Sequence, residues 1–156
     1  MTQPLHVGLL GAMPEEIGSD KSHLEDLSCS EHGDLRVHRG FWGDKVRLSL
    51  AWSGWGKVSA ARAATRLLAS EPRIDLLVFT GVAGAADPGL RQWDVVLADA
   101  VVQHDMDARP LFPRFTVPAL KKDQLQPQPA WFNWAETALR EAHSACLLYT
   151  SPSPRD

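Results

Sequence analysis

The chain has 156 residues, of which 44% are hydrophobic and 22% are charged, a balance that predicts a folded globular domain rather than a fibrous or disordered chain. Its net charge of -3 with scattered Lys and Arg argues against nucleic-acid binding, and its two cysteines are too few for a disulfide framework or a thiolate metal site. No apolar run approaches the roughly 18 residues of a membrane helix, and no signal sequence is present, so we expect a cytoplasmic protein with no membrane partner.

The first predicted element is a β-strand over residues 5–10, an apolar run that ends directly in Gly11-Ala-Met-Pro-Glu-Glu16. Proline near the start and two glutamates in the first turn are typical of a helix amino terminus, so a short helix is predicted over residues 14–26. In open α/β sheets, ligands bind beyond the carboxyl ends of the strands. Glu16 is therefore the first candidate functional residue.

The middle of the chain predicts a hairpin, a helix and two buried strands. Apolar and polar residues alternate over residues 35–37 and 46–50, with a turn at 40–44, which indicates an antiparallel hairpin. Residues 58–69 predict a helix that packs on the sheet through Ala60, Ala61, Ala64, Leu67 and Leu68. Nearly continuous apolar runs at 74–80 and 95–102 are typical of strands covered on both faces. These elements indicate an α/β fold with a parallel or mixed central sheet.

The last third predicts a long loop, a helix and an unusual tail. Residues 104–129 are rich in Pro, Phe and charge without periodicity, which predicts a loop. Residues 130–145 predict a helix whose apolar stripe is Trp131, Trp134, Ala135, Ala138, Leu139 and Ala142. Residues 146–156 resemble the in-frame translation of a sequencing adapter, so we expect a single domain over 1–145 followed by a non-native tail; a natural Ser/Pro-rich tail is the alternative.

Five motifs occur in an order and at spacings that resemble the nucleoside phosphorylase and nucleosidase superfamily, and within it the methylthioadenosine/S-adenosylhomocysteine nucleosidases. They are Gly11-Ala-Met-Pro-Glu-Glu16, Ser53-Gly-Trp-Gly-Lys-Val58, Thr80-Gly-Val-Ala-Gly84, Trp93-Asp-Val-Val96 and His104-Asp-Met-Asp107. The resemblance implies a three-layer fold with a central mixed, partly parallel sheet flanked by helices. The family's ribose-binding Met-Glu segment and catalytic Asp have no counterpart, so we expect a fold incomplete at the carboxyl terminus and a fragment without activity.

The resemblance implies that the intact protein hydrolyses the N-glycosidic bond of an adenosine thioether without a cofactor, with Glu16 positioning and activating water. A carboxylate beside the anomeric carbon also stabilises an oxocarbenium-like transition state. The structural alternative is that Glu15 and Glu16 only favour a helix amino terminus. By the same resemblance, phosphorylases of the superfamily carry a phosphate-binding arginine soon after the first strand. This chain has no Arg or Lys between Gly11 and Lys21, which favours water over phosphate as the nucleophile.

The resemblance also implies a set of substrate-binding residues. Met13 and Trp55 would lie against the 5'-alkylthio group, although both residue types are often core fillers. Val82, which stands where well-known members carry Ser, would lie with Ala83 and Gly84 along the ribose and purine. An ordinary strand-ending turn is the alternative for these last three residues.

The remaining motifs bear on a metal site, a protein partner and other functions. His104-Asp-Met-Asp107 suggests a metal site, but no further His or Cys stands at a supporting spacing, so we expect no metal. The resemblance places Leu111, Phe112 and Phe115 at the interface of a homodimer. A non-catalytic nucleoside-binding or sensor domain and a phosphate-dependent purine nucleoside phosphorylase are the alternative functions.

Overall fold

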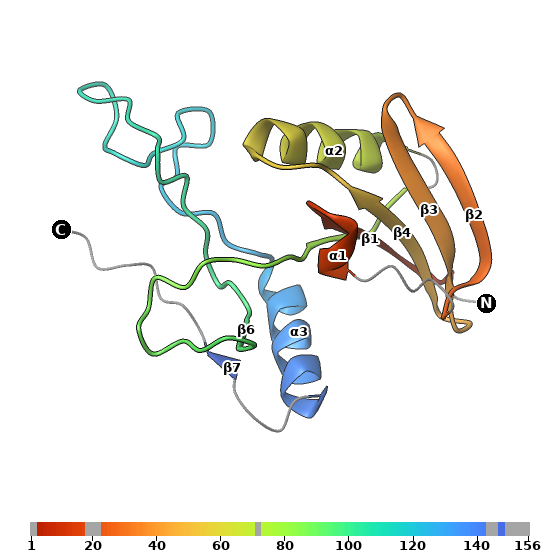
Figure 1. Ribbon diagram of the computed structural model, residues 1–156. Helices are drawn as coiled ribbons and strands as arrows, with labels where there is room; N and C mark the ends of the chain where they lie inside the picture. The colour runs from red at the N-terminus through yellow and green to blue at the C-terminus, as the bar shows by residue number, and fades with distance from the viewer. Residues whose placement is uncertain (1–2, 18–22, 71–72, 143–146, 149–156) are drawn as a thin grey trace. The chain divides into compact units, whose positions relative to one another are not determined.

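The computed structural model describes residues 3–17, 23–70, 73–142 and 147–148. The chain divides into two compact units, Met1–Ala83 and Gly84–Asp156. Within these described ranges, the first unit contains the main sheet and two helices, and the second contains one helix and a short strand pair (Figure 1).

The main sheet has five strands in the order β2-β3-β4-β1-β5. Its central strand β1 runs parallel to both neighbours, β4 and β5, whereas β2, β3 and β4 are successively antiparallel. The mixed, partly parallel α/β sheet predicted from the sequence is therefore present. Its strands are β1 (Leu5–Gly11), β2 (Glu25–His32), β3 (Leu35–Trp42), β4 (Val46–Trp52) and β5 (Leu76–Phe79).

One face of this sheet is covered by α2 (Lys57–Ala69), which lies across β1, β3 and β4 (Figure 1). The predicted helix is confirmed, but the set of residues predicted to pack on the sheet is partly wrong. Ala61 and Leu68 are exposed, and Ala63 is fully buried one turn before Leu67. Spacing of four residues places those two side chains on the same helix face. The buried core between helix and sheet consists of Leu10, Leu35, Val37, Ala51, Ala63, Leu67 and Ile74.

The largest correction concerns the segment after β1. The helix predicted over 14–26 is only the four-residue α1 (Pro14–Ile17), residues 18–22 lie outside the described residues, and β2 begins at Glu25. This strand was not predicted from the sequence. It is an edge strand with mostly exposed side chains, so it carries no apolar alternation and is held through backbone pairing with β3. The hairpin of β3 and β4 is confirmed, with its turn displaced to residues 43–45.

The second unit contains less regular structure than predicted. The strand predicted over 95–102 is reduced to β6 (Val95–Val96), which pairs in parallel with β7 (Leu147–Leu148). Val101 instead forms an isolated antiparallel bridge with Leu125. Val95, Val96, Val101 and Val102 are exposed, so the expectation of a strand covered on both faces is wrong for this run. Its apolar character therefore did not determine burial.

The predicted loop and the last predicted helix are both present. Residues 104–128 consist of turns and isolated bridges, and α3 spans Pro129–Ala142. None of the described α3 side chains is fully buried, and the stripe residue Trp134 is 55% exposed. Of the predicted tail 146–156, only the backbone of β7 lies within the described residues. No helix in the described part of the chain combines the length and apolar character needed to span a membrane.

His6 is a buried polar residue on β1, with 4% of its surface exposed. Its Nδ1 lies 2.8 Å from the carbonyl oxygen of Arg73 and its Nε2 lies 2.8 Å from Ser49 Oγ. Because a carbonyl can only accept, Nδ1 carries the proton and Nε2 accepts from the serine hydroxyl. Burial is the main reason that the pKa of His6 is lowered from 6.5. The folded protein therefore contains the neutral imidazole.

We expect His6 to make the chain less stable in mild acid. The lowered pKa means that the unfolded chain binds the proton more tightly than the folded chain. The contribution of His6 to the free energy of unfolding is therefore complete above about pH 6.5, and it is lost as the pH falls through the pKa of His6 in the folded chain. Each unit of pKa difference corresponds to about 1.4 kcal/mol of unfolding free energy. Urea unfolding of the wild-type chain and a His6→Gln variant at several pH values measures this, and the same pH slope in both would contradict it.

Candidate active site

The carboxyl ends of three strands meet at one edge of the first unit's sheet. Past the last paired residues of β1 and β4, the N–H of Ser53 donates to the carbonyl of Gly11 at 2.9 Å. The N–H of Gly54 donates to the carbonyl of Ala12 at 3.1 Å. On the other side of β1, Thr80 N–H donates to the Leu10 carbonyl at 3.0 Å. These bonds hold the chain segments that follow β1, β4 and β5 beside one another, which is where ligands bind in open α/β sheets.

Glu16 bridges two of these segments through its carboxylate. Its Oε2 accepts hydrogen bonds from Ala12 N at 2.7 Å and Met13 N at 3.0 Å, both in the turn between β1 and α1. Its Oε1 accepts from Val82 N at 3.3 Å, in the segment after β5 and 66 residues further along the chain. Glu16 is partly buried. The carboxylate therefore faces Gly81 and Val82, which follow β5.

The bonds to Ala12 and Met13 match the structural alternative for Glu16. Counting Met13 as the residue before the helix puts Glu16 at the third helical position, where a glutamate reaches back to free backbone N–H groups. Helix capping does not account for the third bond, because Val82 belongs to another segment. Glycine at position 81 leaves room for this approach, because a Cβ atom there would lie 2.9 Å from Glu16 Oε1 and the carboxylate would have to shift.

These backbone donors keep Glu16 ionised. The N–H of Met13 makes the largest contribution, and those of Val82 and Ala12 act in the same direction, so the pKa of Glu16 is lowered from its ordinary value of 4.5 despite the opposing effect of burial. At neutral pH the site therefore presents a carboxylate that acts as a hydrogen-bond acceptor.

Of the other residues singled out in the sequence, those in the first unit follow β1, β4 or β5 along the chain. Met13 is half-buried in the turn that binds Glu16, and Val82 supplies its backbone N–H while its side chain is exposed. Trp55 is 77% exposed in the loop after β4, so it is not a core residue. Ala83 is exposed at the end of the first unit, and Gly84 belongs to the second. The structure thus brings together Met13, Glu16 and Val82.

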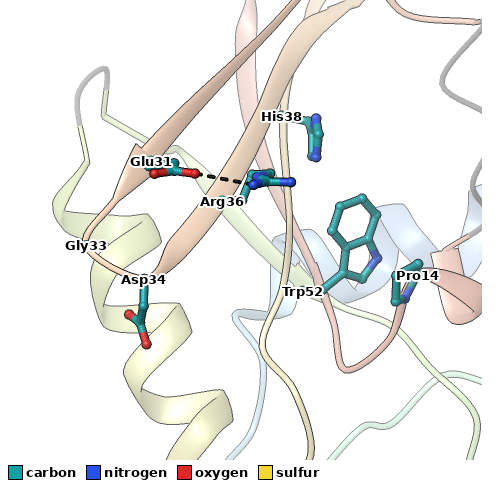
Figure 2. Close-up of a pocket in the computed structure, with 7 residues that line it drawn as sticks. All are labelled: Pro14, Glu31, Gly33, Asp34, Arg36, His38 and Trp52. Carbon is teal, nitrogen blue, oxygen red and sulfur yellow. Dashed lines mark hydrogen bonds and ion pairs between the residues drawn. The ribbon is translucent and has the colours of Figure 1, made fainter.

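Sequence reasoning missed a hollow that begins at the same turn. It has a volume of about 560 Å³ and is lined by Pro14, Glu31, Gly33, Asp34, Arg36, His38 and Trp52. Figure 2 shows Trp52 beside Pro14, with His38 and Arg36 along β3 and Glu31 joined to Arg36 by an ion pair. We call this feature the charged hollow. Only the alternation of Arg36 and His38 with apolar residues indicated that these two side chains share one face.

The segment containing His104 and Asp107 does not form a metal site in the structure. Asp107 is bound by its neighbour Arg109, whose Nε lies 2.9 Å from Asp107 Oδ1, and this guanidinium lowers the pKa of Asp107 to about 2. Within the described ranges, no group of three His, Cys, Asp or Glu side chains is arranged to hold a metal ion.

Comparison with known proteins identifies relatives of this fold. A curated 5'-methylthioadenosine/S-adenosylhomocysteine nucleosidase of Staphylococcus aureus (strain MRSA252) is 37% identical over 102 residues, which cover 65% of this chain and 44% of the relative. This chain therefore spans less than half the length of that curated relative.

Solved structures agree with this similarity. The Neisseria meningitidis nucleosidase of the same name, in complex with methylthio-immucillin-A, superposes with a TM-score of 0.84 at 28% identity, covering 92% of this chain and 62% of that one. The S-adenosylhomocysteine nucleosidase of Streptococcus pyogenes, in complex with 5-methylthiotubericidin, gives 0.82 at 26% identity, covering 97% and 65%. The sequence model of the phosphorylase superfamily matches residues 6–149. This chain belongs to the phosphorylase superfamily.

Proposed function

We propose that the whole protein hydrolyses the N-glycosidic bond of 5'-methylthioadenosine, S-adenosylhomocysteine or both, releasing adenine and the thioribosyl product. The observation that carries the proposal is the Glu16 carboxylate, held by N–H groups from two segments at the carboxyl edge of the sheet. The Staphylococcus aureus and Neisseria meningitidis relatives carry this activity in their names, and their chains are longer than this one.

The chemistry requires a negative charge that stays in place. As the bond between ribose and adenine breaks, positive charge develops on the sugar, and a carboxylate nearby stabilises it while accepting a hydrogen bond from the attacking water. Glu16 Oε2 is occupied by two backbone donors, whereas Oε1 accepts one longer bond from Val82. Oε1 is therefore the oxygen that we assign to water.

Water is a better nucleophile than phosphate for this site. Glu15 and Glu16 both lie in α1, and the turn from Gly11 to Ile17 contains no Lys or Arg. Two carboxylates repel a phosphate dianion at short distance. Adenine release by the whole protein in phosphate-free buffer, without a sugar phosphate product, distinguishes hydrolysis from phosphorolysis.

Replacing Glu16 with Gln in the whole protein is expected to lower the rate of adenine release about 10²–10⁴-fold, because the charge that positions water is lost. Glutamine also serves at the third position of a helix, so the variant should remain folded. Steady-state kinetics with methylthioadenosine measure the loss, and thermal unfolding verifies the fold.

Glu15→Gln is the matched control, since it removes one carboxylate from the same four-residue helix. Its side chain is exposed, and we expect its turnover to match the wild-type protein. Normal turnover by the Glu16 variant would overturn the proposed function, whereas equal losses in both variants would assign the effect to α1 as a whole.

The pH profile provides an independent test. If the ionised form of Glu16 is required, activity falls as pH decreases through its pKa, which lies below 4.5. We expect kcat/KM to decline on the acidic side only below that value. Initial rates measured between about pH 3 and pH 8, with assay at neutral pH after acid incubation to exclude unfolding, test this. An acidic midpoint above 4.5 would argue against Glu16 as the group that must be ionised.

We also propose that the whole protein forms a homodimer through the segment around Leu111. Its side chain is 84% exposed, and an exposed large apolar side chain next to Phe112 and Phe115 suits an interface. Leu111→Asp is expected to shift the protein toward monomer at micromolar concentration, as measured by light scattering after size-exclusion chromatography. Leu120→Asp, at another exposed leucine of the same unit, is the control. A dimer unchanged by Leu111→Asp would contradict this interface.

A further inference from the structure

The loop after β4, residues 53–56, leads from the carboxyl edge of the sheet into α2. Trp55 lies in it between two glycines with positive φ, 77° at Gly54 and 90° at Gly56. In the described part of the chain, a Cβ atom at either glycine would meet nothing within 4 Å beyond its chain neighbours. The N-cap of α2 is Gly56, which has no side chain to cap the helix. The shape of this loop therefore depends on hydrogen bonds to its backbone more than on side-chain packing.

Arg62 of α2 holds this loop from the side of the helix. Its Nη2 donates to the carbonyl oxygen of Ser53 at 3.4 Å. Helical side chains point toward the amino terminus of their helix, so a residue in the second turn can reach back to the residues before the helix. Ser53 is 3% exposed, and its own N–H donates to Gly11 at the end of β1. Through Ser53, Arg62 therefore supports the junction between the segments that follow β1 and β4.

Asp34 in the turn between β2 and β3 orients Arg62. Its carboxylate forms ion pairs with Arg62 and with Arg66, one turn further along α2, and Figure 2 shows it directed toward that helix. The guanidinium is planar, so pairing of Nη1 with Asp34 fixes the direction of Nη2 toward Ser53. Arg66 Nη1 instead donates to the carbonyl of His32, at 3.5 Å. The two arginines share one acid and differ in the carbonyl that they hold.

The free energy of unfolding gives little reason for this arrangement. The side chains of Arg62 and Asp34 are 40% and 55% exposed, and ion pairs with this exposure stabilise a protein only slightly. The feature that distinguishes Arg62 is its contact with the loop at the carboxyl edge of the sheet, where ligands bind in open α/β folds. Its position therefore indicates a role in the site.

We propose that Arg62, oriented by Asp34, is a positioning residue for substrate binding, which fixes the loop after β4 beside the turn after β1; the proposal rests on the function proposed above. A loop that is not held in place must be ordered when the substrate binds, and this ordering weakens binding. The three N–H groups that bind Glu16 come from the turn after β1 and the segment after β5. Arg62 therefore acts on the binding of the substrate more than on the chemical step.

Steady-state kinetics of the whole protein with methylthioadenosine test this proposal, because this neutral substrate has no charge for a distant arginine to attract. We expect Arg62→Gln to raise KM about fivefold, the effect of one modest hydrogen bond, with kcat within about twofold of the wild-type value. Asp34→Asn should also raise KM, since it releases the guanidinium. Arg62→Lys keeps the charge but has one nitrogen for two partners, so it should not restore the wild-type KM.

Arg66→Gln is the matched control, because it removes a guanidinium of nearly equal exposure, 39% against 40%, from the same acid. We expect its kcat and KM to match the wild-type values, and its urea midpoint to match that of Arg62→Gln. Equal rises of KM in both variants would assign the effect to the fold in general and contradict the proposal. A KM that Arg62→Gln leaves unchanged, or that Arg62→Lys restores, also overturns it, and the proposed function then stands because the wild-type protein still releases adenine.

Amide hydrogen exchange in the whole protein gives a measurement that does not depend on activity. The N–H groups of Ser53 and Gly54 are bonded to carbonyls at and after the end of β1, so their exchange rates report opening of the loop. We expect faster exchange at both in Arg62→Gln and wild-type rates in Arg66→Gln. If the wild-type protein hydrolyses neither thioether, the proposed function fails, and exchange decides whether Arg62 holds the loop. Equal exchange rates in the two variants would show that it does not.

Discussion

The parallel pairing of β1 with both β4 and β5 is the constraint on which the rest of the first unit depends. Parallel neighbours end at the same edge of a sheet, so the turn after β1, the loop after β4 and the segment after β5 emerge together. Their first residues are then joined by backbone hydrogen bonds from Ser53, Gly54 and Thr80. The Glu16 carboxylate can reach Val82 only because this edge already holds the two segments beside each other.

Glu16 links local structure to chemistry through one side chain. Two of its hydrogen bonds stabilise the start of a four-residue helix, and the third ties that helix to the segment after β5. The same three donors favour the ionised carboxylate. A carboxylate with a lowered pKa is a weak base, but it is a fixed negative charge and a well-positioned hydrogen-bond acceptor. These properties suit the stabilisation of a cationic sugar better than the abstraction of a proton.

The two faces of the sheet have different roles. On one face, side chains from β1, β3 and β4 pack against Ala63 and Leu67 of α2 and form the core. On the other, β3 and β4 present Arg36, His38 and Trp52 to the charged hollow. Because side chains alternate along a strand, the register that buries Val37 and Ala51 also sets which residues line the hollow. The same register therefore fixes both the core residues and the residues that line the hollow.

Features with a local signal could be predicted from the sequence. These are the apolar run of β1, the alternation in β3 and β4, the α2 helix and the position of Glu16 beside a strand end, because burial of one face leaves a periodic pattern. Contacts between distant segments could not be predicted. Edge strand β2 buries little and carries no pattern, Val82 donates to Glu16 from 66 residues away, and the hollow is built from the start of α1, the β2–β3 turn and three strands. These contacts depend on strand order and register, which the pattern within any single segment does not specify.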